Sequence, residues 1–124
     1  METREYLSRQ LIGLGATMRY RGYNQAICAA ELAITDTENL TLISKRIYPT
    51  VAKLYGAPQY VVERNIRTLI DVIWKTNPDG LCLIAGCPLP RKPTVSDFIS
   101  ILANDAMRNA SRTIIKFEEE PRYS

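Results

Sequence analysis

Histidine is absent from this 124-residue chain, and its absence removes several classes of enzyme. Without an imidazole there is no Ser-His-Asp triad, no Cys-His pair and no histidine-ligated metal. Cysteine is scarce: Cys28, Cys82 and Cys87 are an odd number without the C-x-x-C spacing of a zinc site. We interpret them as buried or inert thiols. We predict no metal, no cofactor and no enzymatic activity.

Long apolar runs and a strong net charge are also missing. The uncharged apolar segments fall far short of the roughly 20 residues that cross a bilayer, and no secretion signal is recognisable at the start of the chain. These absences predict a cytoplasmic protein with no membrane partner. The formal net charge is only +3, but residues 42–92 hold eight basic and three acidic residues. The net charge by itself does not indicate a nucleic-acid partner, and the local positive excess directs attention to the middle of the chain.

Apolar residues recur at spacings of three and four, whereas the alternation typical of strands is rare. The pattern predicts an all-α fold of six helices in one domain over residues 1–110, followed by a partly ordered or flexible acidic tail over 111–124. The helices are expected at about 2–14, 23–34, 40–55 and 58–76, then in a short segment after Asn77 and a last one after Thr94. Pro49 is expected to bend or split the third helix. Glycines are expected to end three of the helices, at Gly15, Gly56 and Gly86.

The third and fourth predicted helices are joined across a short turn that contains Gly56. Such a pair is typical of the helix-turn-helix, whose second helix lies in the major groove of DNA. Ala52, four residues before the glycine, is small enough to let the helices cross closely. Pro58 suits the first turn of the second helix. The apolar contacts between the two helices are expected from Val51, Tyr55 and Val62.

The helix predicted at 58–76 has an apolar and a polar side when drawn at about 100° per residue. The apolar side carries Val62, Ile66, Leu69, Ile70 and Ile73, and the opposite side carries Tyr60, Arg64, Arg67, Asp71 and Lys75. Arg64 and Arg67 lie in the half that points into the groove, where an arginine can donate to O6 and N7 of guanine. Glu63 can accept from the N4 amino group of cytosine. The alternative is a solvated face with ion pairs among Arg64, Arg67 and Asp71.

Several segments make the chain similar, in their order and spacing, to a known family. They are Arg21-Gly22-Tyr23, Ile43-Ser44-Lys45-Arg46-Ile47-Tyr48-Pro49, Val62-Glu63-Arg64-Asn65-Ile66-Arg67, Trp74 and Lys92-Pro93-Thr94-Val95-Ser96-Asp97-Phe98-Ile99. From about Leu11 to Met107 the chain resembles the C-terminal DNA-binding domain of the stage zero sporulation protein A family, the sporulation regulators of endospore-forming bacteria. The resemblance implies a six-helix response-regulator effector domain that binds promoter DNA through a helix-turn-helix, with Glu63 and Arg64 on base edges.

Two features depart from the family pattern. At the position of Val61 the family carries an arginine that reads a base, whereas valine offers only an apolar contact, for example to a thymine methyl group. The family also joins this domain to a receiver with a phosphorylatable aspartate, which these 124 residues do not contain. A free-standing paralogue and a segment of a longer protein both fit this absence.

We therefore predict a sequence-specific, double-stranded DNA-binding transcriptional regulator, associated with the nucleoid when bound and able to form a homodimer on DNA. The base-contacting candidates are Tyr60, Val61, Glu63, Arg64 and Arg67. The phosphate-contacting candidates, which contribute affinity without specifying sequence, are Lys45, Arg46, Lys53 and Lys92. The alternative is a protein-interaction module of the same fold that binds a related regulator or RNA polymerase without contacting DNA.

Two groups of side chains are expected to serve packing. Trp74 lies beside the apolar side of its helix and is predicted to join the core. Cys82 and Cys87 are predicted to be buried on or just after the short fifth helix. Tyr20 and Tyr23 stand among arginines, and this loop fits either single-stranded nucleic acid or a packed arrangement of arginine stems over aromatic rings.

Overall fold

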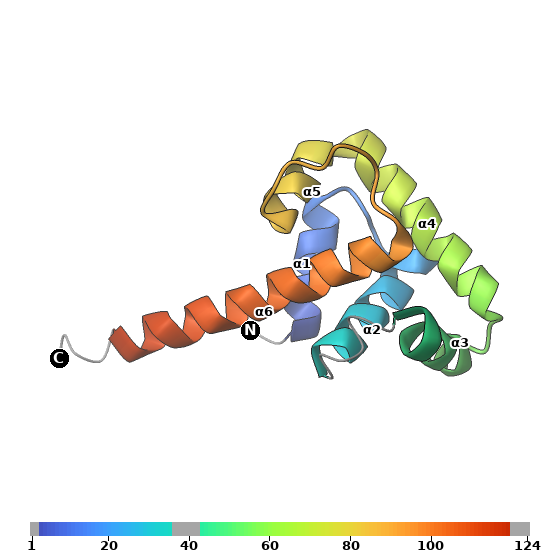
Figure 1. Ribbon diagram of the computed structural model, residues 1–124, viewed down its shortest axis with the longest axis horizontal. Helices are drawn as coiled ribbons and strands as arrows, with labels where there is room; N and C mark the ends of the chain where they lie inside the picture. Colours follow the sequence, from blue (N-terminus) through green and yellow to red (C-terminus); the bar gives the residue numbers. More distant parts are fainter. Residues whose placement is uncertain (1–2, 36–42, 120–124) are drawn as a thin grey trace.

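A computed structural model describes the chain over residues 3–35 and 43–119, and over these ranges the protein is helical with no strand. The α-helices are α1 (Thr3–Gly13), α2 (Arg21–Thr35), α3 (Tyr48–Tyr55), α4 (Gln59–Thr76), α5 (Pro78–Ala85) and α6 (Val95–Glu119). A short π-helix, η2 (Ile43–Ile47), leads into α3. Figure 1 shows the first half of α6 packed among the other helices and its second half extending away from them. The predicted six-helix, all-α fold is confirmed.

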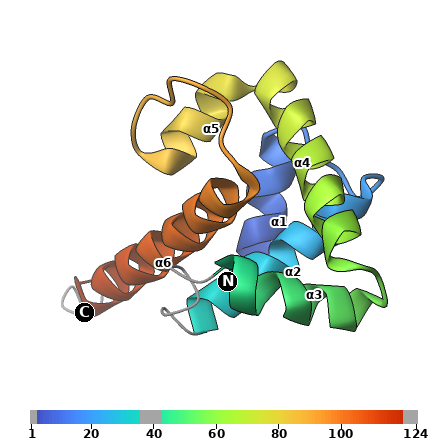
Figure 2. The same cartoon turned by 45° about the vertical axis from the view of Figure 1, so that its right-hand side comes forward.

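Helix α2 lies at the centre of the domain and packs against α1, α3, α4 and α6 (Figure 2). Its sequence is rich in alanine and apolar nearly all round, a pattern that indicates burial on several sides. Ala26, Ala29, Ala30 and Ala33 are each fully buried. Because alanine side chains are small, the neighbouring helices can approach α2 closely.

The closest approach between α2 and α4 is at Gly22. A Cβ atom on this glycine would lie 2.3 Å from the carbonyl oxygen of Asn65. Next to this contact, Nδ2 of Asn65 donates a hydrogen bond of 3.1 Å to Oε1 of the buried Gln25. Tyr23 is buried, and its hydroxyl group is hydrogen-bonded to Ser8. Tyr23 therefore belongs to the buried part of α2 and does not offer its ring for base stacking.

Three helices end at glycines in the left-handed region. The φ angles of Gly15, Gly56 and Gly86 are 92°, 60° and 80°. After each glycine, the next residue donates its backbone N–H to the carbonyl five residues earlier, which is the pattern of a Schellman motif. These hydrogen bonds join Ala16 to Leu11 at 2.9 Å, Ala57 to Ala52 at 3.0 Å and Cys87 to Cys82 at 3.3 Å. The predicted helix ends at the three glycines are confirmed.

Proline positions explain two boundaries. The helical segment around Pro49 is divided into η2 and α3, in agreement with the predicted split. Pro58 stands one residue before α4 as its N-cap, with an extended ψ of 149°, and not in the first turn as predicted. The turn expected at residues 36–39 and the expected start of the third helix at Leu40 lie outside the described residues.

The last helix, α6, starts where the sequence predicted and extends past the expected end of the domain. Its start has the predicted cap, because the N–H of Asp97 donates to Oγ1 of Thr94 at 3.1 Å. Its backbone continues to Glu119, past residue 110, where the sequence suggested the end of the domain. The division into a domain and a tail stays a prediction.

Within the described ranges, no helix is long and apolar enough to cross a membrane.

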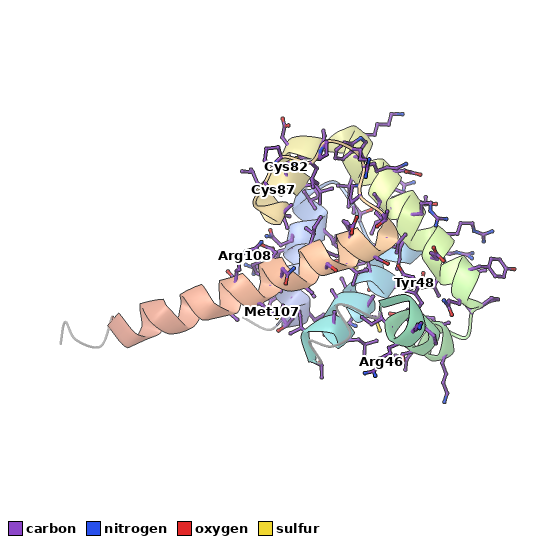
Figure 3. All side chains as sticks on the ribbon, in the orientation of Figure 1. Arg46, Tyr48, Cys82, Cys87, Met107 and Arg108 are labelled. Atoms are coloured by element: carbon purple, nitrogen blue, oxygen red, sulfur yellow. The ribbon has the colours of Figure 1, made fainter. Side chains whose placement is uncertain are left out.

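Asp105 of α6 connects the last helix to the first. Its Oδ2 atom accepts hydrogen bonds of 2.8 Å from the hydroxyl group of Tyr6 and from Nε2 of Gln10. One turn further, Arg108 donates to the carbonyl oxygen of Ile84 at 2.7 Å and links α6 to α5 (Figure 3). These contacts hold α1, α5 and α6 together on the side of the domain away from the start of α4.

Candidate nucleic-acid interface

Helices α3 and α4 form the predicted helix-turn-helix, with residues 56–58 as the turn. Val51 and Val62 are fully buried, and Ala52 packs partly buried against the core. Tyr55 does not pack between the two helices as expected, since it is 41% exposed. Burial still raises the pKa of its hydroxyl group, which lies near the Cys28 thiol and the Arg4 guanidinium. Tyr55, one turn after Val51, thus lies near α1 and α2 and not between α3 and α4.

The two sides of α4 are oriented as the sequence predicted. The five apolar residues, Val62, Ile66, Leu69, Ile70 and Ile73, are at most 1% exposed. The opposite residues, Tyr60, Arg64, Arg67, Asp71 and Lys75, are all exposed. Trp74 is partly buried against the core, as predicted. Since the buried side of α4 is held by α2 and α6, its rotation about its own axis is determined, and its polar side must face outward.

The polar side of α4 carries one ion pair within the helix. Nη2 of Arg67 lies 3.0 Å from Oε1 of Glu63, one turn earlier. Side chains on a helix lean toward its N-terminus, so Arg67 reaches Glu63 more readily than Asp71. The ion pairs considered among Arg64, Arg67 and Asp71 are not formed. Arg64 is exposed and makes no ion pair with any residue in the described ranges.

Lys92 reaches α4 from the loop that follows α5. Its ammonium group pairs with the carboxylate of Asp71, and both side chains are about half exposed. Lys92 also lines a hollow of about 380 Å³ between α4 and the first turn of α6. The hollow is lined by Tyr48, Glu63, Arg67, Lys92, Pro93, Thr94, Val95 and Ser96. A cation predicted to bind phosphate therefore lies beside the residues predicted to read bases.

Tyr48, Thr94 and Ser96 were not among the predicted site residues, although they line this hollow. The hydroxyl groups of Tyr48 and Ser96 are 3.2 Å apart. Burial raises the pKa of the Tyr48 hydroxyl. The capping pattern at Thr94 locates the start of α6, but nothing in the sequence places that start beside α4.

The remaining phosphate candidates precede α4. Lys45 and Arg46 lie on η2 and Lys53 on α3, and all three are exposed. The hydroxyl of Thr50 donates to the carbonyl of Arg46 at 2.9 Å and joins η2 to α3. Basic side chains are thus present on the elements before and after α4.

The first two turns of α4 also carry Tyr60 and Val61. Tyr60 is 68% exposed, whereas Val61 is half-buried.

The two cysteines near the end of α5 differ from expectation. Cys82 is half-buried and Cys87 is exposed, so the prediction that both are buried is wrong. The reason is Gly86, whose left-handed conformation turns the chain outward after α5.

A helical domain whose helix-turn-helix presents an arginine-bearing outer face belongs to the class of DNA-binding domains. Comparison with known families agrees. Residues 7–106 match the family described as Sporulation initiation factor Spo0A C terminal, and the chain belongs to this family. The family consists of DNA-binding effector domains of a sporulation regulator and is not a family of enzymes. Its DNA partner is the Spo0A box.

Proposed function

We propose that this chain is a transcriptional regulator that binds double-stranded DNA sequence-specifically, with α4 in the major groove. The orientation of α4 carries the proposal. Its five apolar residues are buried, so Arg64 is directed outward and makes no ion pair with the described residues. An unpaired arginine one turn after a tight helix-turn-helix turn is available for bidentate donation to O6 and N7 of guanine.

Glu63 and Arg67 act together in this proposal. The carboxylate of Glu63 has about four lone-pair sites and can accept from Arg67 and from the N4 amino group of cytosine at the same time. Arg67 then orients Glu63 and keeps a second N–H direction free for a neighbouring base. Tyr60 and Val61, in the first turn, make the contacts closest to the start of the helix.

Lys45, Arg46, Lys53 and Lys92 bind phosphates on the two sides of the groove. In this role the ammonium group of Lys92, which pairs with Asp71 in the free chain, exchanges that carboxylate for a DNA phosphate. Phosphate contacts set the register of the helix and supply most of the salt-dependent affinity. As parts of the same proposal, the chain forms a homodimer on duplexes with two boxes and is found with the nucleoid in the cytoplasm.

Fluorescence anisotropy tests the proposal with two labelled duplexes, one carrying the Spo0A box and one scrambled. Arg64→Ala should weaken binding to the box by ~1 to 3 kcal/mol and change scrambled binding much less. Lys75→Ala is the matched control, because it removes a positive charge from the same outer face near the opposite end of α4. It should affect both duplexes equally. If the unmodified chain does not distinguish the duplexes at low salt, the proposal is wrong.

A second function, a protein-interaction module, is favoured by one observation. Leu54 and Tyr60 stand on either side of the turn between α3 and α4 and are 65% and 68% exposed. In this alternative they contact RNA polymerase or a related regulator. Leu54→Ser should then abolish capture of purified RNA polymerase, and the unmodified chain should bind neither duplex. If Leu54→Ser captures as much RNA polymerase as the unmodified chain does, this alternative is wrong.

A further inference from the structure

Cys82 and Cys87 occupy two linked positions at the end of α5. The N–H of Cys87 donates to the carbonyl of Cys82 at 3.3 Å, and the N–H of Gly86 donates to the carbonyl of Leu83 at 3.2 Å. These two hydrogen bonds define a Schellman motif with the cysteines at its first and last positions. Side chains at these two positions frequently contact each other. The backbone therefore places Cys82 and Cys87 next to each other at one helix end, although five positions separate them in sequence.

The same motif occurs twice more in this chain. At the end of α1 its paired positions are Leu11 and Ala16, both fully buried in the core. At the end of α3 they are Ala52 and Ala57, both partly buried against the core. In each of these motifs the paired side chains are apolar and serve packing. Only the α5 motif, among the described residues, carries two groups that can form a covalent bond with each other.

The cysteine pair is accessible from solvent. Cys87 is exposed and Cys82 is half-buried, and both line a hollow of about 610 Å³ beside α5. The sulfur of Cys82 accepts a hydrogen bond of 3.4 Å from the N–H of Leu89, so the loop after Cys87 folds back over it. Cys28, on α2, is buried and belongs to a different part of the fold. Figure 3 shows Cys82 and Cys87 together at α5.

We propose that Cys82 and Cys87 are a redox modification site, which hydrogen peroxide converts to an intramolecular disulfide. The Cys87 thiolate attacks one peroxide oxygen, the O–O bond breaks and the released hydroxide takes up a proton as water. The Cys82 thiolate then attacks the sulfur of the resulting sulfenic acid, the S–O bond breaks and a second water leaves. Two thiols and one peroxide thus give one disulfide and two waters.

This site is independent of the proposed DNA interface. It follows the C-terminal end of α4, whereas Glu63 and Arg64 lie in the first two turns of that helix. The oxidation is measured from the alkylation and mass of a peptide, and the measurement requires no DNA. Failure of one proposal therefore leaves the other untouched.

The test uses the whole chain treated with hydrogen peroxide, alkylated with iodoacetamide and digested with trypsin. Lys75 and Arg91 flank both cysteines, so residues 76–91 form one peptide, and Cys28 lies in another. We expect neither cysteine of the 76–91 peptide to be alkylated, and the peptide to be two hydrogen atoms lighter than its reduced, unalkylated form. Dithiothreitol should restore both alkylations. The Cys28 peptide should stay alkylated throughout.

Two variants complete the test. In Cys82→Ser the second thiol is missing, so Cys87 should persist as a sulfenic acid that dimedone traps, with no loss of two hydrogens. Cys28→Ser should behave as the unmodified chain. A covalent dimer joined through Cys87, or sulfinic acid on Cys87 with Cys82 still alkylated, would overturn the proposal. So would an unmodified 76–91 peptide after treatment.

Discussion

Gly22 of α2 and Asn65 of α4 are in direct backbone contact, with no space for a side chain between them. A Cβ atom at residue 22 would lie 2.3 Å from the carbonyl oxygen of Asn65 and 3.1 Å from the Cα atom of Ile66. Asn65 directly follows Glu63 and Arg64. The contact with a single glycine therefore positions the part of α4 that carries the proposed base-reading residues.

Gly22→Ala should destabilise the domain by ~1 to 3 kcal/mol, because the added methyl group meets backbone atoms that cannot move aside without displacing α4. Urea unfolding measures the change. Gly13→Ala is the matched control, since a Cβ there meets nothing within 4 Å. It should leave the free energy of unfolding unchanged or raise it by up to ~1 kcal/mol. A Gly22→Ala variant as stable as the unmodified chain would contradict the close approach.

Val61→Arg should tighten binding to the Spo0A box. An arginine at this position stands beside Arg64 and adds up to two charge-assisted hydrogen bonds to a guanine, worth ~1 to 3 kcal/mol. Anisotropy with the box and the scrambled duplex measures the gain, which should be confined to the box. A selection from random duplexes with the unmodified chain should return a site relaxed or changed at the base pair that this arginine would read. Equal gains on both duplexes would show that residue 61 lies outside the groove.

Lys53→Ala should weaken binding to all duplexes together and reduce the salt slope of log K by about one unit, because one phosphate contact is lost. Titrations at several salt concentrations give the slope. Arg9→Ala, which removes an exposed cation from α1, should leave the slope unchanged. An unaltered slope in Lys53→Ala would place Lys53 away from the phosphates.

Tyr48 should make the domain sensitive to alkaline pH. Burial raises the pKa of its hydroxyl in the folded state, while the unfolded chain keeps the ordinary value of about 10. The folded state therefore holds the proton more tightly, and the free energy of unfolding falls as pH rises above the ordinary pKa. Tyr48→Phe removes this contribution and should show a smaller loss of stability above about pH 10. A Tyr48→Phe variant that loses as much stability above about pH 10 as the unmodified chain would contradict this prediction.

Local signals in the sequence predicted much of this fold. Gly15, Gly56 and Gly86 end helices because only a residue without a Cβ atom adopts a positive φ at low cost. The apolar stripe of α4 is read directly from its spacing, and all five of its residues are buried. Such features depend on neighbours within one or two turns, so one sequence is sufficient to find them.

Contacts between distant segments were not predictable in the same way. Lys92 pairs with Asp71 across 21 positions because an irregular loop returns to α4, and the path of a loop has no periodic signal. Tyr55 lies near Cys28 of α2 and Arg4 of α1, and this neighbourhood depends on how helices distant in sequence cross. Cys87 is exposed because of the direction in which Gly86 turns the chain. The roles of the site residues toward DNA stay predictions.

The link between Asp105 and α1 has a consequence for the newly made protein. Tyr6 and Gln10 are separated from Asp105 by 99 and 95 positions, so their partner leaves the ribosome long after they do. Until then α2 and α4 lack α6, against which both pack. In a nascent chain, α3 and α4 are therefore fully synthesised before the helix α6, against which α4 packs, is available. A frameshift or stop codon before Val95 would yield a protein that contains every proposed base-reading residue but lacks the helix against which α2 and α4 pack.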